Sequence, residues 1–328
     1  MKKNILITGG TGSFGKNFIK KILKKDLFKK IIIFSRDEFK QTKMAQELKN
    51  DKRLRFFLGD VRDKERLTIA TKDTDIIIHA AALKHVPIAE YNPYEFVKTN
   101  IIGSENIAKV ALLNKVKKTI LLSTDKAANP ANLYGATKLC AEKIFISSNY
   151  YSNRNDCSFS VVRYGNVINS RGSVLPHFKQ LIDQGSKYLP VTDKRMTRFF
   201  ITFDRAIDFV LYVIKHSIGS EIFVPKLPSL KIFDLAKSLV SQQRIKIIGV
   251  RPGEKLHEKM ITWDESRQVI ELKDSYVILP DQTFKKIDYV KTDYFKKGKL
   301  LKKNFTYSSD LNDKWLKENE IKKILRDG

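Results

Sequence analysis

The stretch NILITGGTGSFGK, residues 4–16, decides the fold of this chain. An apolar run is followed by a glycine-rich loop that includes Gly9, Gly12 and Gly15, and then by apolar residues at helical spacing. In a strand–loop–helix unit, such glycines permit a tight turn, a close approach of the backbone to a pyrophosphate, and close packing of the helix on the strand. The helix N-terminus adds N–H donors and a positive dipole. A purely structural turn can carry the same glycines, but the strand before them and the helix after them favour a dinucleotide-binding loop.

The first 165 residues continue this alternation of apolar runs and helical patterns. Runs that are apolar almost throughout are typical of parallel strands covered on both faces. Strands are predicted at 4–8, 30–34, 54–59, 75–79, 119–123 and 159–163, and helices at 38–50, 62–71, 103–114 and 136–149. The alternation predicts an α/β fold with a doubly wound parallel Rossmann sheet.

The rhythm loosens after residue 165, where basic segments marked by proline and glycine are separated by helical patterns. We therefore expect three parts. Residues 1–165 form a Rossmann domain that binds the dinucleotide. Residues 166–280 form mainly a smaller C-terminal substrate-binding lobe, with some return to the Rossmann sheet, and residues 281–328 form a lysine-rich C-terminal extension.

Composition narrows the class of protein. The chain has 328 residues, of which 42% are hydrophobic and 30% charged, as in soluble globular proteins. No apolar run reaches the roughly 20 residues that a membrane helix needs, so we expect a cytoplasmic protein that does not bind a membrane. The net charge of +26 comes from lysines spread along the chain, with no arginine-rich arm or aromatic RNA-binding signature. We therefore expect anionic small ligands rather than nucleic acid.

The cysteines and histidines predict neither a disulfide framework nor a metal site. Cys140 and Cys157 form no CxxC pair. The five histidines, at positions 79, 85, 177, 216 and 257, lie too far apart for the paired spacings of metal ligands. We expect two reduced thiols and no metal.

The residues after the second predicted strand favour NADP over NAD. Ser35 and Arg36 stand at the strand end, where an acidic residue would bind the ribose hydroxyls of NAD, and Lys40 follows. Cations at this place suit a 2′-phosphate. Asp37 keeps NAD open as the alternative, because a displacement of the loop by one residue would bring it to the ribose.

The ends of the third and fourth predicted strands extend the cofactor site. Asp60, in GDVRD (59–63), can accept a hydrogen bond from the adenine amino group. Ala80 and Ala81 let a backbone lie against the cofactor, although plain tight packing explains small residues there equally well. The candidate cofactor residues are Gly9, Thr11, Gly12, Ser13, Phe14, Gly15, Ser35, Arg36, Lys40, Asp60, Val61, Ala80, Ala81, Tyr134 and Lys138.

The stretch STDKAANPANLYGATK, residues 123–138, carries the predicted chemistry. Tyr134 and Lys138 lie one helical turn apart and therefore point the same way. A free tyrosine has a pKa of about 10, which a nearby ammonium and a positive nicotinamide lower. The phenolate can then take a proton from an alcohol or sugar hydroxyl as hydride leaves the same carbon.

At these residues the sequence resembles a known family, the extended short-chain dehydrogenase/reductases that act on nucleotide sugars. The resemblance rests on GGTGSFG, GDVRD, HAAALKHVP, STDKAANPANLYGATK, RYGNVINSRGSV and RPGEKLHE, and runs from residue 3 to about 280. Within that family, the sequence is most similar to the inverting UDP-N-acetylglucosamine 4,6-dehydratases of pseudaminic acid biosynthesis. This implies tightly bound NADP, a homo-oligomer (hexamer or dimer) and a role in bacterial surface or flagellin glycosylation.

The resemblance also implies roles for the two residues after Thr124. Sugar 4,6-dehydratases in general carry Thr-Asp-Glu here, whereas this chain has the Thr124-Asp125-Lys126 of the inverting enzymes. Asp125 would protonate the departing O6, and neutral Lys126 would remove the C5 proton that a transient C4 ketone makes acidic. A free lysine has a pKa of about 10.4, so this requires burial, a neighbouring cation or proton exchange with a carboxyl group. An ordinary salt bridge between Lys126 and Asp125 is the alternative.

The substrate residues are predicted by type and by the resemblance. Two phosphates require cations, and Arg171, Arg198 and Arg251 stand in loop segments. By resemblance, Lys84 and Asn166 contact the sugar and phosphates of UDP-N-acetylglucosamine. The candidate substrate residues are Lys84, Thr124, Asn166, Arg171, Val174, Arg198, Arg251 and Glu254, the last as a nucleoside contact.

Other functions stay open at this point. A C5-retaining 4,6-dehydratase or a UDP-sugar 4-epimerase would use the same scaffold, and an epimerase needs neither Asp125 nor Lys126. A regulator that binds NADP without turnover is disfavoured by Tyr134 and Lys138. A nucleic-acid binder would require tight, sequence-tolerant DNA binding at physiological salt.

Overall fold

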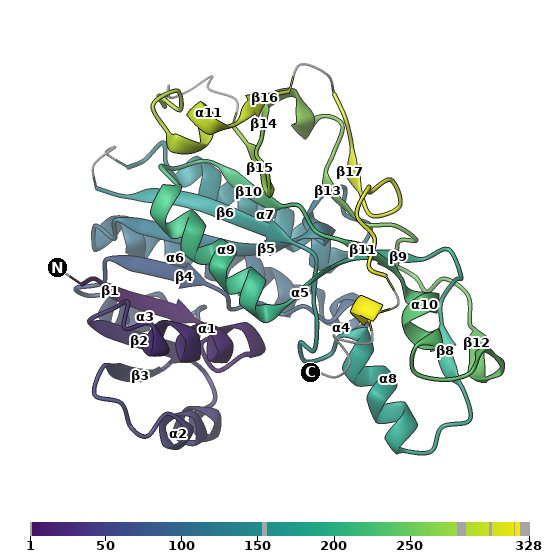
Figure 1. Cartoon of the computed structure of the whole chain (residues 1–328). Coiled ribbons are helices and arrows are strands. Elements are labelled where there is room, and N and C mark those ends of the chain that lie inside the picture. Colours follow the sequence, from purple (N-terminus) through teal and green to yellow (C-terminus); the bar gives the residue numbers. More distant parts are fainter. Residues whose placement is uncertain (1, 153–155, 281–286, 302–303, 318, 322–328) are drawn as a thin grey trace.

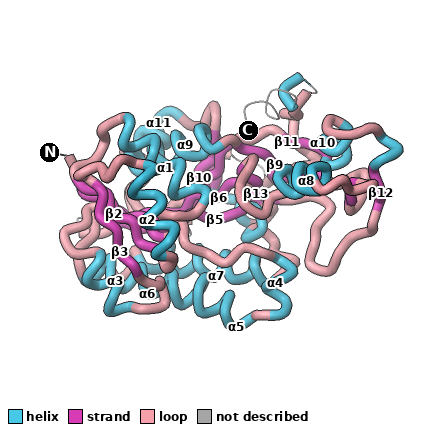
Figure 2. Tube along the Cα trace, turned by 90° about the horizontal axis from the view of Figure 1, so that it is seen from below, coloured by secondary structure: helices cyan, strands magenta, loops and turns pink. Residues whose placement is uncertain are grey.

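The computed structural model describes residues 2–152, 156–280, 287–301, 304–317 and 319–321 (Figure 1). One large sheet with helices on both faces makes up most of the molecule, and a smaller lobe lies beyond the carboxyl ends of its central strands (Figures 1 and 2). No helix in these ranges is long and apolar enough to cross a membrane.

The large sheet confirms the predicted doubly wound fold. Its described strands run in the order β16-β14-β15-β10-β6-β5-β4-β1-β2-β3. The parallel strands are β3 (Leu54–Leu58), β2 (Lys30–Ser35), β1 (Asn4–Thr8), β4 (Ile76–His79), β5 (Lys118–Thr124), β6 (Ser158–Tyr164) and β10 (Ile222–Pro225). The antiparallel edge consists of β15 (Ser275–Ile278), β14 (Val269–Glu271) and β16 (Lys299–Leu300). All six strands predicted from apolar runs are present, with ends that differ by at most one residue.

Helices cover both faces of the sheet (Figure 2). On one face lie α1 (Ser13–Lys24), α9 (Phe203–His216) and α11 (Asp293–Lys297), and on the other α3 (Lys64–Ala70), α6 (Gly103–Leu113) and α7 (Leu133–Ser148). The remaining helices of this part are α2 (Glu38–Glu47), α4 (Val86–Tyr91) and α5 (Pro93–Phe96). Helix α7 begins three residues earlier than predicted, because Asn132 accepts a hydrogen bond from Gly135 N–H at 2.8 Å and caps it. Tyr134 therefore lies in the first turn of this helix.

The smaller lobe has its own apolar core. It contains β7 (Asn166–Val167), β9 (Thr197–Ile201) and β11 (Ser229–Lys231) in one sheet, the parallel pair β8 (Leu189–Val191) and β12 (Ile245–Ile247), and helices α8 (Val174–Asp183) and α10 (Ile232–Lys237). Leu175, Phe178, Val191 and Leu235 are among its buried residues. Since β10, β14 and β15 join the large sheet, residues 166–280 divide between lobe and sheet, and the boundary at 165 stays a prediction.

The described parts of the C-terminal extension pack onto the rest of the chain. Strand β16 joins the large sheet, and β17 (Tyr307–Ser308) pairs with β13 (Lys259–Ile261). Residues 281–286, 302–303, 318 and 322–328 of the predicted extension lie outside the described residues. The pairing of β17 with β13 brings Ser309 next to the segment that follows RPGEK, with consequences for the site below.

Candidate active site

The glycine-rich loop has the geometry that the sequence predicted. Gly9 has φ +63°, and a Cβ there would lie 2.9 Å from the nitrogen of Ala81. A Cβ on Gly12 would lie 3.0 Å from the Gly9 carbonyl oxygen, and one on Gly15 would lie 2.5 Å from the Gly10 carbonyl oxygen. Any side chain at these positions would therefore fill the loop or push α1 away from β1. Without side chains, the loop forms a cradle in which a phosphate group can lie close to the protein backbone.

Helix α1 leaves its first N–H groups for a ligand. Its N-cap is Gly12, which has no side chain to accept a hydrogen bond, and the first intrahelical bond is donated by Lys16 to Gly12 at 2.9 Å. The N–H groups of Ser13, Phe14 and Gly15 therefore have no acceptor within the helix. Together with the cradle, these donors fit a pyrophosphate, and Thr11 lies buried within the loop.

The end of β4 lies next to this loop, and buried hydrogen bonds connect it to β1. Thr8 Oγ1 accepts hydrogen bonds from the N–H groups of Ala80 and Ala81, both at 3.2 Å, and lies 2.7 Å from His79 Nδ1. Burial lowers the pKa of His79 to about 3, so this imidazole is neutral. The predicted contact residues Ala80 and Ala81 thus face the glycine loop directly.

The end of β2 carries charges of both signs, with Arg36 and Lys40 beside Asp37 and Glu38. Asp37 caps α2 by accepting from Lys40 N–H at 2.9 Å, and its carboxylate also pairs with the Lys40 ammonium. Hydrogen bonds from Lys40 lower the pKa of Asp37, and the charge of Arg171 lowers it further. Arg36 lies half-exposed, 3.6 Å from Asp60. Ser35 is buried and accepts from the Gln41 side chain at 3.0 Å, so it supports the turn.

Asp60 and Val61 lie at the end of β3 as predicted, but Asp60 already has strong partners. Its carboxylate accepts from Arg62 Nη2 at 2.7 Å and from Arg62 N–H at 3.0 Å. Burial alone would raise the pKa of Asp60, but these hydrogen bonds outweigh burial and lower it. Val61 is buried where α6 begins, and its side chain lies against Gly103.

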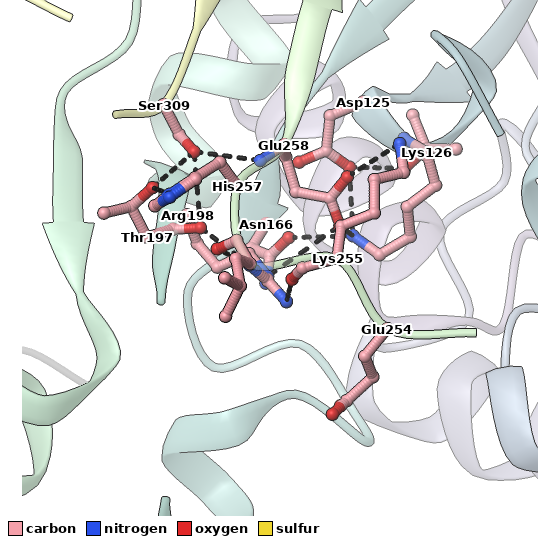
Figure 3. A network of polar contacts seen from close by, with 12 residues as sticks. Asp125, Lys126, Asn166, Thr197, Arg198, Glu254, Lys255, His257, Glu258 and Ser309 are labelled. Carbon is pink, nitrogen blue, oxygen red and sulfur yellow. Dashed lines mark hydrogen bonds and ion pairs between the residues drawn. The ribbon is translucent and has the colours of Figure 1, made fainter. Parts of the chain in front are cut away.

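Asp125, which is buried, and Lys126, whose side chain is 20% exposed, form an ion pair in the tight turn after β5 (Figure 3). Lys126 Nζ lies 3.0 Å from Asp125 Oδ1, which also accepts from Thr124 Oγ1 at 3.0 Å. Asp125 is fully buried, and burial raises its pKa, opposed by the charge of Lys126. Burial alone would lower the pKa of Lys126, but the charges of Asp125 and Glu258 outweigh it and raise this pKa above its ordinary value. Lys126 is therefore an ammonium at neutral pH, and its Nζ lies 3.0 Å from the Asp125 carboxyl group.

Tyr134 lies buried beside this pair, and Lys138 is buried one turn further along α7. Burial raises the pKa of Tyr134 to about 12, while the charge of Lys126 and a hydrogen bond with Thr124 oppose the rise. Burial lowers the pKa of Lys138 to about 8, against the charge of Glu142. All four predicted catalytic side chains thus come from one short stretch at the end of β5 and the start of α7.

Some of the predicted substrate residues lie at the catalytic pair, and the others lie elsewhere. Lys84, Thr124 and Asn166 lie at the catalytic pair: Asn166 Oδ1 is 3.3 Å from Lys126 Nζ, and burial and then the charge of Lys126 lower the pKa of Lys84. Val174 begins α8 and packs on the core of the lobe.

The predicted arginines take other partners. Arg198 is buried and donates to the backbone carbonyls of Thr197, Lys255 and Leu256 at 2.7–3.0 Å. Arg251 pairs with Glu254, whose carboxylate points away from the catalytic pair (Figure 3).

Arg171 lies at the dinucleotide loop, because its N–H donates to Ser13 Oγ at 3.2 Å. That these three arginines bind the substrate stays a prediction.

Glu258 is a buried residue of the site that the sequence analysis did not select. It belongs to RPGEKLHE, and its carboxylate lies 3.4 Å from Lys126 Nζ and 3.3 Å from Lys255 Nζ (Figure 3). The only signal in the sequence was a second acidic residue in a motif rich in cations. Among the described residues, no group of three His, Cys, Asp or Glu side chains is arranged to hold a metal ion.

A Rossmann sheet with this glycine loop, followed by a buried tyrosine–lysine pair, defines an extended short-chain dehydrogenase/reductase. The chain belongs to the family described as polysaccharide biosynthesis protein, which matches residues 5–280.

Relatives within this class bear the names of two different reactions. A UDP-N-acetylglucosamine 4,6-dehydratase (inverting) from Campylobacter jejuni is 52% identical over 99% of this chain and 97% of its own. A UDP-glucose 4-epimerase from Rickettsia bellii is 42% identical over 98% of this chain and 95% of its own. The crystal structure of Pen from Bacillus thuringiensis superimposes with a TM-score of 0.88 at 36% identity, over 99% of this chain and 98% of that one.

Proposed function

We propose that this chain removes water from UDP-N-acetylglucosamine across C5 and C6, with NADP as cofactor, and inverts C5 to give a UDP-2-acetamido-2,6-dideoxy-4-hexulose. The observation that carries the proposal is the ion pair of buried Asp125 and largely buried Lys126, 3.0 Å apart, beside Tyr134. The elimination of water needs both an acid and a base close to the sugar, whereas a hydride transfer alone does not need such a pair. The 52% identical relative is named for this reaction.

The cofactor would be held by the glycine cradle, the first turn of α1 and the end of β2. The carboxylate of Asp37 is engaged by Lys40 and by the cap of α2, the charge of Arg171 acts on it, and Arg36 lies 3.6 Å from Asp60. This arrangement suits a 2′-phosphate better than a free ribose diol, and therefore supports NADP. When bound, the nicotinamide supplies a positive charge and the hydride acceptor for C4, and later the donor for C6.

Tyr134 is the base for the first step. Its hydroxyl, beside Thr124, would take the O4 proton of the sugar once its pKa falls from about 12. The charge of Lys126 already lowers that pKa, and the positive charge of a bound cofactor would lower it further. The resulting C4 ketone makes the C5 hydrogen acidic.

The second step uses one proton that moves between Lys126 and Asp125. At 3.0 Å, the Lys126 ammonium can pass a proton to Asp125 Oδ1, which leaves a neutral amine and a carboxylic acid. The amine then takes the C5 proton, and Asp125 gives its proton to O6 as water departs. The pair ends as the ammonium and carboxylate with which it began. Hydride transfer to C6 and addition of a solvent proton to the opposite face of C5 would complete the inverted product, and Tyr134 would release the O4 proton to solvent, so the protons balance.

A UDP-sugar 4-epimerase is the second candidate, since a 42% identical relative bears an epimerase name. An epimerase would oxidise and reduce C4 with Tyr134 and Lys138 alone. The buried charges of Asp125 and Lys126 would then have no chemical use at considerable desolvation cost. That cost favours the dehydratase. The homo-oligomer, the cytoplasmic location and the pseudaminic acid pathway are further parts of this proposal.

The proposal is tested by incubating the protein with UDP-N-acetylglucosamine in deuterated water and following the product by NMR. A C6 methyl group, deuterium at C5 and inverted C5 stereochemistry are expected. Lys126→Ala should form no such product. Full turnover by Lys126→Ala would refute the assigned base. A product that differs from the substrate only at C4 would establish the epimerase, and retained C5 stereochemistry would refute the inversion.

A further inference from the structure

Glu258 completes a cage of three acceptors around the amino group of Lys126. Nζ lies 3.0 Å from Asp125 Oδ1, 3.3 Å from Asn166 Oδ1 and 3.4 Å from Glu258 Oε1. An ammonium has three N–H bonds, so the cage can hold all of them. These acceptors come from three separate segments that converge on the same nitrogen (Figure 3).

The backbone of Glu258 is fixed from the C-terminal extension. Glu258 N–H donates to Ser309 Oγ at 2.9 Å, and Ser309 N–H donates to the Glu258 carbonyl oxygen at 2.8 Å. Ser309 Oγ also lies 2.7 Å from Thr197 Oγ1, which in turn is 2.8 Å from His257 Nδ1. The Glu258 residue is only 2% exposed. Its carboxylate therefore has little freedom to move away from Lys126.

We propose that Glu258 is a positioning residue that holds the Lys126 amino group in place and makes it a stronger base for the elimination. The inference rests on the proposed function for its chemistry, but the contact it describes can be tested without turnover. Lys126 acts on the substrate, whereas Glu258 acts through Lys126.

The physical argument is electrostatic. A fixed negative charge next to an amine stabilises the ammonium, and a base whose conjugate acid is more stable removes a carbon-bound proton more readily. Glu258 also raises the pKa of Asp125, which helps that carboxyl group to accept the proton that Lys126 must release. Without Glu258, Lys126 would be neutral more often but less basic.

Other charged groups around Lys126 bear on the same balance. From β9, Arg198 lowers the pKa of Lys126 and lies 3.8 Å from Glu258. Lys84 approaches from the loop after β4, and Lys255 neutralises the far oxygen of Glu258. Tyr134 approaches from α7 and titrates only at high pH. With three cations nearby, the carboxylates are the groups that keep Lys126 protonated.

The test is competitive acetylation with trace acetic anhydride at mildly alkaline pH, read peptide by peptide by mass spectrometry. The rate at Lys126 is divided by the rate at Lys291, whose side chain is 85% exposed. In Glu258→Gln, the ratio should rise about tenfold or more, since each pKa unit lost multiplies the neutral amine tenfold. Glu258→Asp keeps the charge and should stay near the wild type. Equal ratios in wild type and Glu258→Gln would overturn the proposal.

Two controls separate charge from loosening of the fold. Glu271→Gln removes a half-buried carboxylate on β14 that pairs with Lys226. It should leave the ratio of acetylation at Lys126 to that at Lys291 unchanged. Lys84 reports loosening: its acetylation should stay low in Glu258→Gln, and a parallel rise at Lys84 and Lys126 would contradict a charge effect. Melting temperatures of the variants show whether each is folded.

Turnover supplies the second readout. Glu258→Gln should lower the plateau of kcat roughly 3- to 10-fold, by Brønsted behaviour, and leave the KM for UDP-N-acetylglucosamine unchanged. The acid limb of its pH profile should move to lower pH. An unchanged profile would reject the proposal. If the wild type performs no dehydration while acetylation still responds to Glu258→Gln, the proposed function fails and the Glu258–Lys126 contact stands.

Discussion

Replacement of Lys126 by Met should destabilise the protein strongly at neutral pH and much less at mildly acidic pH. The ammonium lies 3.0 Å from Asp125 and 3.4 Å from Glu258, whose side chains are 0% and 3% exposed. Methionine fills similar space without charge. Glu258 would keep Lys255 and Arg198 as partners, but Asp125 would keep only the hydroxyl of Thr124.

The expected loss follows from the buried carboxylate that is left behind. Removing one partner of a fully buried ion pair costs about 3–5 kcal/mol, and we expect the lower end here because the Lys126 side chain is 20% exposed. Burial already raises the pKa of Asp125, and loss of the Lys126 charge raises it further. Folded Asp125 then binds its proton more tightly than the unfolded chain, where its pKa is about 3.9, so the penalty applies above that pH. Acidification should therefore relieve it, by up to about 1.4 kcal/mol per pH unit.

Urea unfolding of the wild type and Lys126→Met in neutral and mildly acidic buffer measures this difference. Lys291→Met, which removes an exposed ion pair with Asp288, is the control and should cost less than about 1 kcal/mol in both buffers. Equal stabilities of wild type and Lys126→Met at neutral pH would refute the reasoning. If the loss of stability in Lys126→Met did not shrink on acidification, it would be caused by packing and not by charge.

Three further predictions concern the cofactor loop and α7. Burial lowers the pKa of Lys138 to about 8, so binding of the nicotinamide dinucleotide should weaken as the pH rises through that value. The Lys138→Met variant should bind the cofactor weakly and with little pH dependence. A fluorescence titration with the cofactor checks both expectations. Gly15→Ala should lose cofactor affinity in the same titration while it stays folded, since its Cβ would lie 2.5 Å from a loop carbonyl. Asn132→Ala should cost about 1 kcal/mol in thermal unfolding, because it removes the cap of α7, and an unchanged melting temperature would contradict this.

Much of the fold could be predicted because parallel strands leave a local signature. The apolar run at 4–8 predicted β1 with its observed ends, and the salt bridge between Asp125 and Lys126, which the sequence left open as an alternative, is present. The start of α7 was missed by three residues, since it depends on a cap by Asn132 that a helical pattern does not report. Local periodicity describes backbone and faces, and for these it was sufficient.

The partners of long side chains could not be predicted in the same way. Arg171, expected at the substrate, has its backbone at the dinucleotide loop, and Arg198 donates to three backbone carbonyls. Glu258 lies far from Lys126 in the sequence, and their contact depends on how the lobe and the C-terminal segment close over the sheet. Such contacts are set by tertiary structure, which residue type and spacing do not encode.

A buried ion network explains how the two halves of the site are held in register. Arg163 on β6 is fully buried and pairs with Glu142 on α7, one turn beyond Lys138. The same guanidinium donates at 2.9 Å to the Met260 carbonyl, two residues after Glu258, and pairs with Glu265 at 2.8 Å. A buried pair of this kind adds little net stability, because its desolvation offsets its attraction. Its geometry, however, joins the helix that carries Tyr134 and Lys138 to the segment that carries Glu258, so one side chain links the positions of these two parts of the site.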